Sequence, residues 1–534
     1  MATTNKKRES VDSKETKASH HNFMGGQSFD ISNPITLLRV AASSCFFGEP
    51  QYYRDEKHPA KAKTAGASSI LTTVGREHLN KQLNRIDPQE WRTLSPSKLM
   101  ESAIDAALSF DAEATLAEAA RLRREEHIRT TPQVILVRAA NHSKVRGTGL
   151  VRRYAHASIA RADEPSVGLA YQLAAYPGKP IPNALKKAWA DALSGFSGYS
   201  LAKNRMEDRQ VKTVDVVNLV HAKSDAVSAL VKGELKNTDQ TWEAIISKEG
   251  SNKESWSKAL DVMGHMAMLR NVRNLLNKGV EPKQFMEKLV AGAPTGKQLP
   301  FRYVAAYEAI KGIAPGSVQD AIEDCLKASL GNLPEFKGRL MSLCDNSGSA
   351  QNATTSSMGT MKVSTIANLT GTLAGMRADD GYVGVFGDRI CTHAIRKNAS
   401  VFDQLAKQEQ SAREVGQSTE NGIWLFWDKA IKEREHWDHV FVFSDMQAGH
   451  GGLYGTNANH YAEYVWPDGR HIDVSKLIRK YRSTVNQNVN VYLVQVAGYQ
   501  DTIVPEFYDR TYILGGWGEG LLRFAASMNG MCQQ

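Results

Sequence analysis

The sequence predicts a multidomain protein, with an all-α part built from helical repeats followed by an α/β part. At 534 residues the chain is too long for a single hydrophobic core. Apolar residues at helical spacing dominate residues 29–336, where strand-like runs are rare. Across residues 337–534, short apolar runs alternate with helical patterns. This alternation predicts a doubly wound, mostly parallel sheet that helices cover on both faces.

The α/β part divides into short strands and amphipathic helices. Apolar runs short enough for buried strands occupy residues 340–344, 382–386, 440–444, 489–496 and 512–514. Helical spacing occupies residues 362–377, 422–435, 473–481 and 519–528. The glycines at 515, 516 and 518 lack the spacing and the Lys-Ser/Thr pair of a phosphate-binding loop, so we expect a strand-to-helix turn there. A nucleotide is therefore not the expected ligand of this sheet.

The helical part contains long amphipathic stretches. Residues 253–278 place Trp256, Leu260, Leu269 and Leu275 on one broad apolar face. Residues 211–231, 282–290 and 301–313 show the same pattern. Short links rich in Gly, Pro, Asn or Ser favour antiparallel helix pairs, and stacked pairs form solenoids with concave surfaces. No clean repeat period is visible, so the repeats are expected to be divergent.

Composition limits the class of protein. Hydrophobic residues make up 42% of the chain and charged residues 23%, which favours packed cores over disorder. The net charge of +9 favours an anionic partner. The five cysteines have no C-x-x-C spacing, which argues against a structural zinc site or a disulfide framework and fits a reducing compartment. Residues 1–28 are polar, so we expect a disordered tail rather than a signal peptide, and a cytoplasmic protein.

The residues Asp345-Asn346-Ser347-Gly348-Ser349 directly follow the first predicted strand of the sheet. A strand that ends in D-x-S-x-S brings one carboxylate and two hydroxyls into a single turn at the carboxyl edge of the sheet, where such sheets bind ligands. Hard oxygen ligands suit a small divalent cation, above all Mg²⁺. An ordinary serine-rich turn that caps a helix is the alternative.

Two residues further along the chain favour the metal site. Thr419 lies in the loop before the predicted helix at 422–435, and Asp445 follows the strand at 440–444. By itself, Asp445 could equally cap a helix. Taken together, the motif and these two residues resemble the metal-ion-dependent adhesion site of von Willebrand factor A domains. The resemblance implies a Rossmann-like fold and a divalent cation held by Asp345, Ser347, Ser349, Thr419 and Asp445. The second loop reads Gln-Ser-Thr where the family often has Gly-Gly-Thr, so Ser418 is the alternative to Thr419.

Basic residues are concentrated in two stretches of the helical part. One runs from Arg121 to Arg161 and the other from Lys186 to Lys223. Basic helices that also carry His and Tyr are typical of surfaces that bind RNA phosphates and unstacked bases. A solvated helix face is the alternative interpretation.

Three short segments connect the helical part to a known family. RVAASSCFFGEPQYY at 39–53, MLRNV at 268–272 and LPFR at 299–302 resemble parts of the TROVE module. A TROVE module followed by a von Willebrand factor A domain is the arrangement of the Ro autoantigen family, bacterial orthologues included. The resemblance covers the chain from about residue 31. It implies a HEAT-like helical-repeat ring that the A domain closes, and a closed ring within one chain would make a monomer sensible.

The resemblance also implies a function. Ro proteins bind small structured Y RNAs on an outer basic surface and single-stranded 3′ ends of misfolded RNAs in the central hole, and bacterial members are thought to cooperate with a 3′ exoribonuclease. The segment that carries Y RNA contacts in the family suggests Lys203, Arg205, Arg209 and His221. For the hole the candidates are Arg129, Lys144, Arg146 and Arg152.

Two other functions stay open at this point. A metal-dependent hydrolase would need a general base beside an open metal position, and the histidines of the α/β part are not at ligand spacing: His393, His436, His439 and His450. A protein-binding adaptor without an RNA role would show no salt-sensitive RNA affinity. We therefore expect an RNA-binding scaffold with no catalysis of its own.

Overall fold

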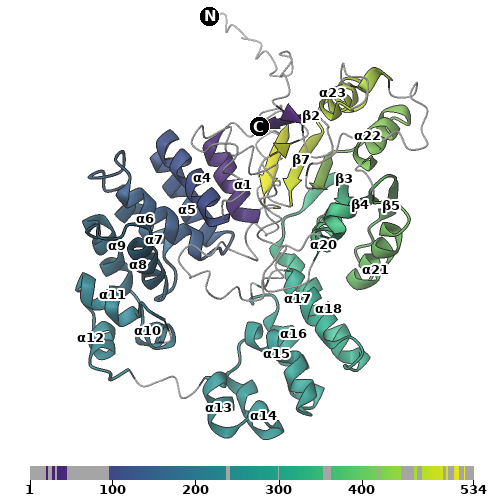
Figure 1. Ribbon diagram of the computed structural model, residues 1–534. Coiled ribbons are helices and arrows are strands. Elements are labelled where there is room, and N and C mark those ends of the chain that lie inside the picture. The colour runs from purple at the N-terminus through teal and green to yellow at the C-terminus, as the bar shows by residue number, and fades with distance from the viewer. Residues whose placement is uncertain are drawn as a thin grey trace, which may run out of the picture.

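The computed structural model consists of an arc of helices and a sheet domain, joined by further helices (Figure 1). It describes residues 20–21, 27–30, 33–44, 96–207, 209–235, 241–296, 298, 300–352, 362–417, 421–444, 446, 462–465, 472–496, 501–502, 510–515 and 522. The predicted change from helices to strands occurs where β3 begins, at Phe336. The predicted fold class, a helical-repeat part closed by an α/β domain, is confirmed.

The first hydrophobic core holds together the helices of the arc. Its helices are α1 (Pro34–Ser44), α4 (Pro96–Phe110), α5 (Ala112–Arg124), α6 (Thr130–Asn141), α7 (Leu150–Ser158), α8 (Glu164–Ala175), α9 (Asn183–Ser194), α10 (Gly198–Lys203), α11 (Thr213–Val220) and α12 (Asp225–Val231). Neighbours along the chain or one helix apart pack against each other, as in α5 with α7 and α6 with α8. Fully buried Trp189 and Tyr171 are the largest side chains of this core. This pattern is the stacking expected of divergent helical repeats.

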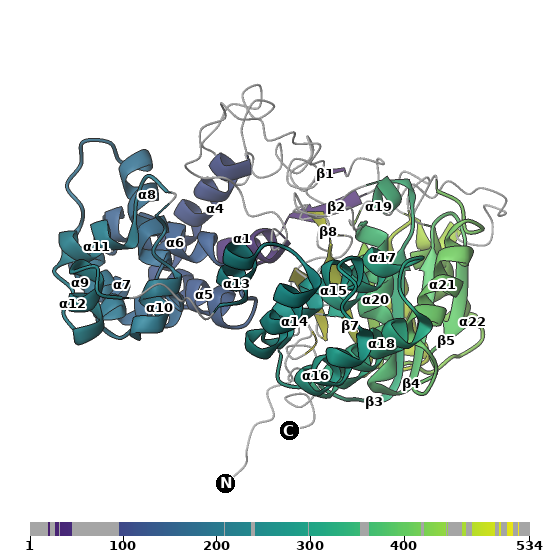
Figure 2. The ribbon, with the colours of Figure 1, turned by 90° about the horizontal axis from the view of Figure 1, so that it is seen from below.

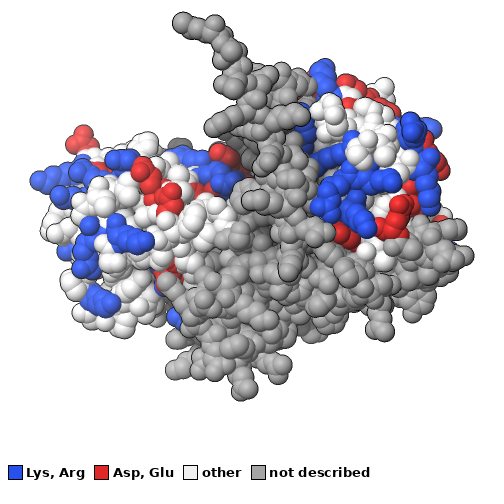
Figure 3. All heavy atoms as spheres, turned by 90° about the horizontal axis from the view of Figure 1, so that it is seen from above, with Lys and Arg blue, Asp and Glu red and all other residues white. Residues whose placement is uncertain are grey.

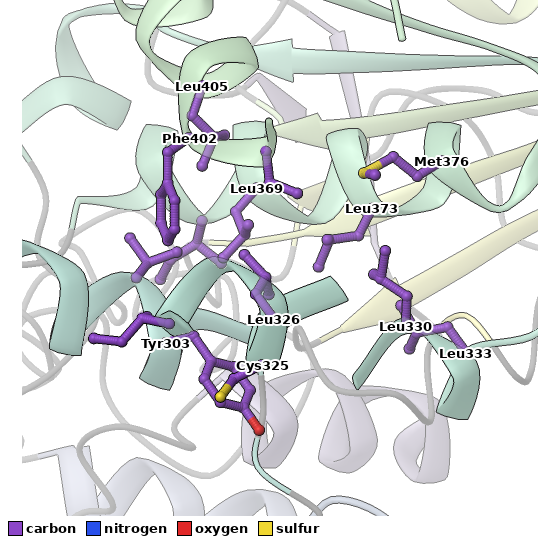
Figure 4. Close-up of a cluster of buried hydrophobic side chains, with 14 of the residues drawn as sticks. Tyr303, Cys325, Leu326, Leu330, Leu333, Leu369, Leu373, Met376, Phe402 and Leu405 are labelled. Carbon is purple, nitrogen blue, oxygen red and sulfur yellow. The ribbon is translucent and has the colours of Figure 1, made fainter. Parts of the chain in front are cut away.

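The remaining helices lie between the arc and the sheet, on the underside of the molecule (Figure 2). They are α13 (Trp242–Glu249), α14 (Lys253–Val262), α15 (His265–Asn277), η3 (Pro282–Gln284), α16 (Met286–Gly292), α17 (Pro300–Ile310), α18 (Gly316–Ser329) and η4 (Leu330–Asn332). Their apolar residues belong to a second core that continues into the sheet domain. In Figure 4, Leu326 and Leu330 at the end of α18 face Leu369 and Leu373 of α20 in the sheet domain.

Among the residues that the structure describes, the sheet domain has six strands in the order β5-β4-β3-β6-β7-β9. The strands are β3 (Phe336–Asp345), β4 (Ala378–Phe386), β5 (Ile390–Ala394), β6 (His439–Ser444), β7 (Asn490–Gln495) and β9 (Thr511–Gly515), and the helices are α19 (Gly348–Asn352), α20 (Val363–Met376), α21 (Val401–Ala412), α22 (Gly422–Lys432), η6 (Ala462–Tyr464) and α23 (Val474–Thr484). All pairings are parallel except that of β4 with β5. Apolar residues of the two faces fall into different cores, so helices cover both faces as predicted.

The N-terminal segment joins the arc to the sheet domain through contacts with β8 and β9. Strand β2 (Gln27–Asp30) pairs with β1 (His20–His21) and with β8 (Asp501–Thr502). Helix α1 packs against β9, and Ile513 of β9 contacts the core of the arc. Helices α13–α18 follow the arc along the chain and share the core of the sheet domain, so these contacts close the chain into a ring. Part of the predicted disordered tail thus forms strands, and residues 1–19 and 22–26 lie outside the described residues.

Some predicted helices are divided in the structure. Residues 253–278 form two helices, because α14 ends before Met263 and Gly264 caps α15. Residues 211–231 form α11 and α12, with His221 in the left-handed conformation between them (φ 54°). The last predicted helix, at 519–528, lies outside the described residues except for position 522. No helix in the described part of the chain is both long and apolar enough to span a bilayer.

Candidate metal centre and nucleic-acid interface

The D-x-S-x-S loop begins at the carboxyl end of β3, a central strand between β4 and β6. The last six residues of β3 are buried, and Asp345 is 0% exposed. The main-chain N–H of Asn346 donates to the main-chain carbonyl of Phe386 in β4 (2.8 Å), which ties the start of the loop to the end of the neighbouring strand. The hydrophobic run therefore places the carboxylate at the edge of the sheet, as the sequence predicted.

Inside the loop the predicted oxygen ligands lie close together. The Ser347 amide donates to Asp345 Oδ1 (2.8 Å), and the two serine hydroxyls are 3.1 Å apart. Neighbouring ligands of an octahedral Mg²⁺ ion lie about 3.0 Å apart, because each is about 2.1 Å from the metal. Asp345 and Ser347 are buried, while Ser349, in the first turn of α19, is exposed. The three residues fit the donor set of a small hard cation.

Buried amide side chains form hydrogen bonds between the loop and α20. Asn346 donates through Nδ2 to Cys344 O (2.9 Å) and Asn368 Oδ1 (3.0 Å). Its Oδ1 accepts from Asn368 Nδ2 (3.2 Å) and Gln351 Nε2 (3.0 Å). Asn346 and Asn368 are almost fully buried, so these bonds fix the loop against α20. Hydrophobic periodicity carries no signal for such a network, and sequence reasoning missed it.

The second predicted loop reaches the same place. Gly348 N–H donates to the Gln417 carbonyl (2.9 Å), two residues before Thr419. Thr419 and its alternative, Ser418, lie outside the described residues. So does Asp445, although Ser444 at the end of β6 lies one register step beyond the Cys344–Phe443 pair, beside Asp345. In the described part of the chain no three His, Cys, Asp or Glu side chains gather as a metal cluster, and a D-x-S-x-S site does not require one.

The histidines of the sheet domain that the structure describes lie away from this loop. His439 begins β6 and donates through Nε2 to Lys337 O (3.2 Å), at the opposite edge of the sheet. His436 contacts Asp438 at that same edge (3.1 Å). His393 on β5 contacts the Ser411 hydroxyl (2.9 Å). His450 lies outside the described residues. None of the described histidines is placed as a general base beside Asp345.

In the arc, one group of basic residues gathers where α6, α8 and α11 begin, here called the amino end. Arg129 donates to Asp163 Oδ2 (3.0 Å), and Arg161 donates to both oxygens of the same carboxylate (3.0 Å each). Arg161 also donates to Asn204 Oδ1 (2.8 Å), directly after Lys203. Arg129 therefore lies with the segment predicted to contact Y RNA, and not with the other candidates for the hole.

The residues of the 203–209 segment differ in how exposed their side chains are. Arg205 donates to Leu235 O and pairs with Glu207 (3.3 Å), which fixes the chain after α10 to the chain after α12. Arg205 is half-buried, whereas Lys203 and Arg209 are exposed. Lys203 and Arg209 are therefore better placed than Arg205 to reach a ligand.

A second basic group lies at the other end of the same helices, here called the carboxyl end. Lys144 donates to Ser109 O (2.5 Å), and Arg152 pairs with Asp191 (2.5 Å). The Lys223 amide donates to Ser194 Oγ at the end of α9 (3.0 Å), which brings His221 and Lys223 to this end. Arg146 is exposed in the loop after α6. Helix α6 has 12 residues and is about 18 Å long, so it separates the two groups.

The structure thus regroups the eight predicted RNA contacts. Arg129 joins Lys203, Arg205 and Arg209 at the amino end, while Lys144, Arg146, Arg152 and His221 share the carboxyl end. Figure 3 shows basic side chains over the helical part of the molecule and again over the sheet domain. Sequence reasoning passed over Tyr199 as a candidate, although its spacing to Lys203 (i, i+4) puts both on one helix face.

Comparison with known proteins places these features in a family context. Residues 222–321 match the TROVE domain, a region that begins just after His221 and contains the MLRNV segment of α15. No curated protein matches the chain. Its fold is similar to that of the Ro (RSR) protein of Deinococcus radiodurans, with a TM-score of 0.57 and 15% sequence identity over 79% of this chain and 93% of that one. Residues 222–321 therefore match a TROVE domain, and the chain as a whole shares the fold of that Ro protein.

Proposed function

We propose that the chain is a cytoplasmic RNA-binding scaffold without catalytic activity of its own. The observation that carries the proposal is the gathering of exposed basic side chains at both ends of helices α6–α11, in a chain with a TROVE match and a Ro fold. Phosphate contacts from such side chains give affinity without reading sequence. A protein that must accept many different RNAs needs this kind of affinity.

The two basic groups suit the two RNA ligands that the family resemblance implies. A small structured Y-like RNA would bind at the amino end, where Arg129, Lys203 and Arg209 lie. Single-stranded 3′ ends of misfolded RNA would pass through the ring, and a narrow hole would admit them in preference to a duplex. A 3′ exoribonuclease that acts on the same ends is the partner we propose, and the protein would work as a monomeric ring.

The D-x-S-x-S loop would hold a divalent cation, which we propose to be Mg²⁺. Asp345, Ser347 and Ser349 would bind it, with Thr419 and Asp445 as the further ligands that the resemblance implies. When bound, the cation would offer a coordination position to an acidic group of a partner protein. The burial of Asp345 at the end of β3 and the hydrogen bonds of Asn346 with Asn368 support this proposal.

Salt-dependent RNA binding tests the main proposal. The probe is a stem-loop RNA with a single-stranded 3′ tail, and the variant is Lys203→Glu with Arg209→Glu. For the wild type we expect affinity to fall steeply with salt, and for the variant a slope lower by roughly 0.7–0.9 for each phosphate that the variant no longer neutralises. The matched control is Lys429→Glu with Lys432→Glu, which reverses two exposed lysines of α22 in the sheet domain.

Two results would contradict the RNA-scaffold proposal. A flat salt response of the wild type would mean that phosphates do not carry the binding, and would favour a protein-binding adaptor. An equal loss in the α22 control would mean that net charge alone sets affinity.

Separately, Asp345→Ala should abolish Mg²⁺ binding measured by calorimetry and leave RNA affinity intact. Loss of both would show that the loop organises the ring instead of a partner surface.

A further inference from the structure

Helix α10 presents an aromatic ring to solvent. The side chain of Tyr199 is 60% exposed, and in the described part of the chain only Phe110 is an aromatic exposed to the same degree. The helix itself is well anchored, because Leu201 is completely buried in the core of the arc and Ser197 caps its first turn (3.3 Å to Ser200 N–H). An ordered helix thus holds the ring in place, so little side-chain entropy would be lost on binding.

A lysine stands beside the ring. Lys203 follows Tyr199 by one helical turn, and its Nζ lies 5.7 Å from the centre of the ring. This distance falls within the range of cation–π attraction, which fixes the ammonium next to the ring. Each nucleotide carries a flat base and a phosphate on the same ribose. An aromatic ring and an ammonium held side by side match those two groups.

The pair lies at the border of the amino-end basic group. Asn204 donates to Ser200 O (2.8 Å) and accepts from Arg161 (2.8 Å), so the end of α10 is tied to the arginines there. Arg205 fixes the following loop through Leu235 O. A strand of RNA whose phosphates follow this group therefore passes the ring at close range.

We propose that Tyr199 stacks on an unpaired base while Lys203 binds the phosphate of the same nucleotide. The proposal rests on the proposed RNA-binding function and adds a preference to it. Bases within a duplex already stack on each other and cannot cover the ring, whereas a looped-out or single-stranded base can. Tyr199 would thus favour RNA with an unpaired nucleotide beside its duplex.

Fluorescence of a short single-stranded RNA that carries 2-aminopurine tests the proposal, with a fully paired duplex of the same sequence as comparison. Wild-type protein should quench the fluorophore, because stacking on an aromatic ring does so. Tyr199→Ala should lower affinity for the single strand by about 5- to 150-fold, the loss of one stacked base. Affinity for the duplex and the salt slope should not change, since no charge is removed.

Three controls complete the design. Tyr199→Phe keeps the ring and should bind like the wild type, which excludes a role of the hydroxyl. Leu173→Ala removes an exposed apolar side chain of α8 (53% exposed) and should have no effect. Unchanged circular dichroism of each variant shows that the fold is intact.

The outcomes separate the stacking proposal from the wider function. If wild-type protein binds both RNAs with a steep salt response and Tyr199→Ala binds the single strand equally well, the stacking proposal is wrong and the RNA function stands. If the wild type binds neither RNA, both proposals fail. An equal loss for single strand and duplex would also overturn the stacking role, because it would show that Tyr199 supports the surface in general.

Discussion

His439 should make the stability of the sheet domain fall in mild acid. Its side chain packs against the rings of Phe336 and Tyr492 and is 1% exposed. The neutral ring donates through Nε2 to Lys337 O (3.2 Å), and Nδ1 faces the Tyr492 hydroxyl (3.5 Å). Burial lowers the pKa of His439 to about 4, although nearby Asp438 partly opposes this shift. The folded protein therefore resists protonation of a group that the unfolded chain protonates easily.

The direction of the effect follows from proton linkage. Between the folded pKa of about 4 and an unfolded value of about 6.5, only the unfolded chain binds the proton. Stability is therefore lost as the pH falls through this window, and the loss stops below the folded pKa. With these values the loss near pH 5 relative to pH 7.5 is on the order of 2 kcal/mol.

Hydrogen exchange of the β6 amides at the two pH values measures this loss as the free energy of local opening. His265 and His393 also have pKa values lowered by burial and act in the same direction. The variant His439→Gln keeps a donor for Lys337 O but cannot titrate, so the difference between wild type and variant isolates His439. An identical pH dependence in both proteins would refute the reasoning.

Two further predictions concern the loop at 345–349 and the contact between α18 and α21. Gly348→Ala should lower the free energy of unfolding by about 1–3 kcal/mol, because an added Cβ would lie 2.9 Å from Gln417 O. In the control Gly316→Ala the added Cβ has no atom within 4 Å, so the free energy of unfolding should not change. An equal loss for both variants in urea unfolding would contradict this prediction. Glu323→Ala should cost about 1–3 kcal/mol, since its carboxylate accepts from two donors at the start of α21 (2.8 and 2.9 Å). Its control, Glu335→Ala, removes an ion pair whose carboxylate is exposed and should change the urea midpoint little. Similar losses in the two variants would show that the contact between α18 and α21 adds nothing.

In the sheet domain, the sequence predicted the strands of the six-stranded sheet that are buried on both faces and missed β5, which is not. The second half of β3, from Leu340, and all of β6 are buried and mostly apolar, and such runs indicate central parallel strands. β5 has only five residues, none of them fully buried, and pairs antiparallel at the edge of the sheet. α21 escaped notice because its buried face includes glutamines: Gln408 donates to Thr372 Oγ1 (2.8 Å) within the core. A hydrophobic pattern cannot show a buried polar side chain.

The sequence predicted more of the candidate metal site than of the RNA-binding surface. Proximity within one turn follows from the sequence, whereas proximity between distant segments does not. Asp345, Ser347 and Ser349 lie within one turn, so their proximity follows from covalent spacing and the end of a strand. Thr419 and Asp445 come from other loops and remain predictions. The RNA contacts depend on helix direction, which spacing does not reveal. Arg129 lies near Arg161 because both bind Asp163.

The sheet domain is better understood as a segment of the ring than as an appended module. The apolar residues of α17 and α18 belong to the same core as α20 and β3. Tyr307 of α17 stacks on Phe402 of α21 with ring centres 3.8 Å apart. A helical part cut before β3 would leave these faces bare, and an exposed apolar surface of that extent promotes aggregation. Asn368 of α20 also donates to and accepts from Asn346 in the D-x-S-x-S loop. Helix α20 therefore both supports this loop and shares a core with α17 and α18, the last helices before the sheet.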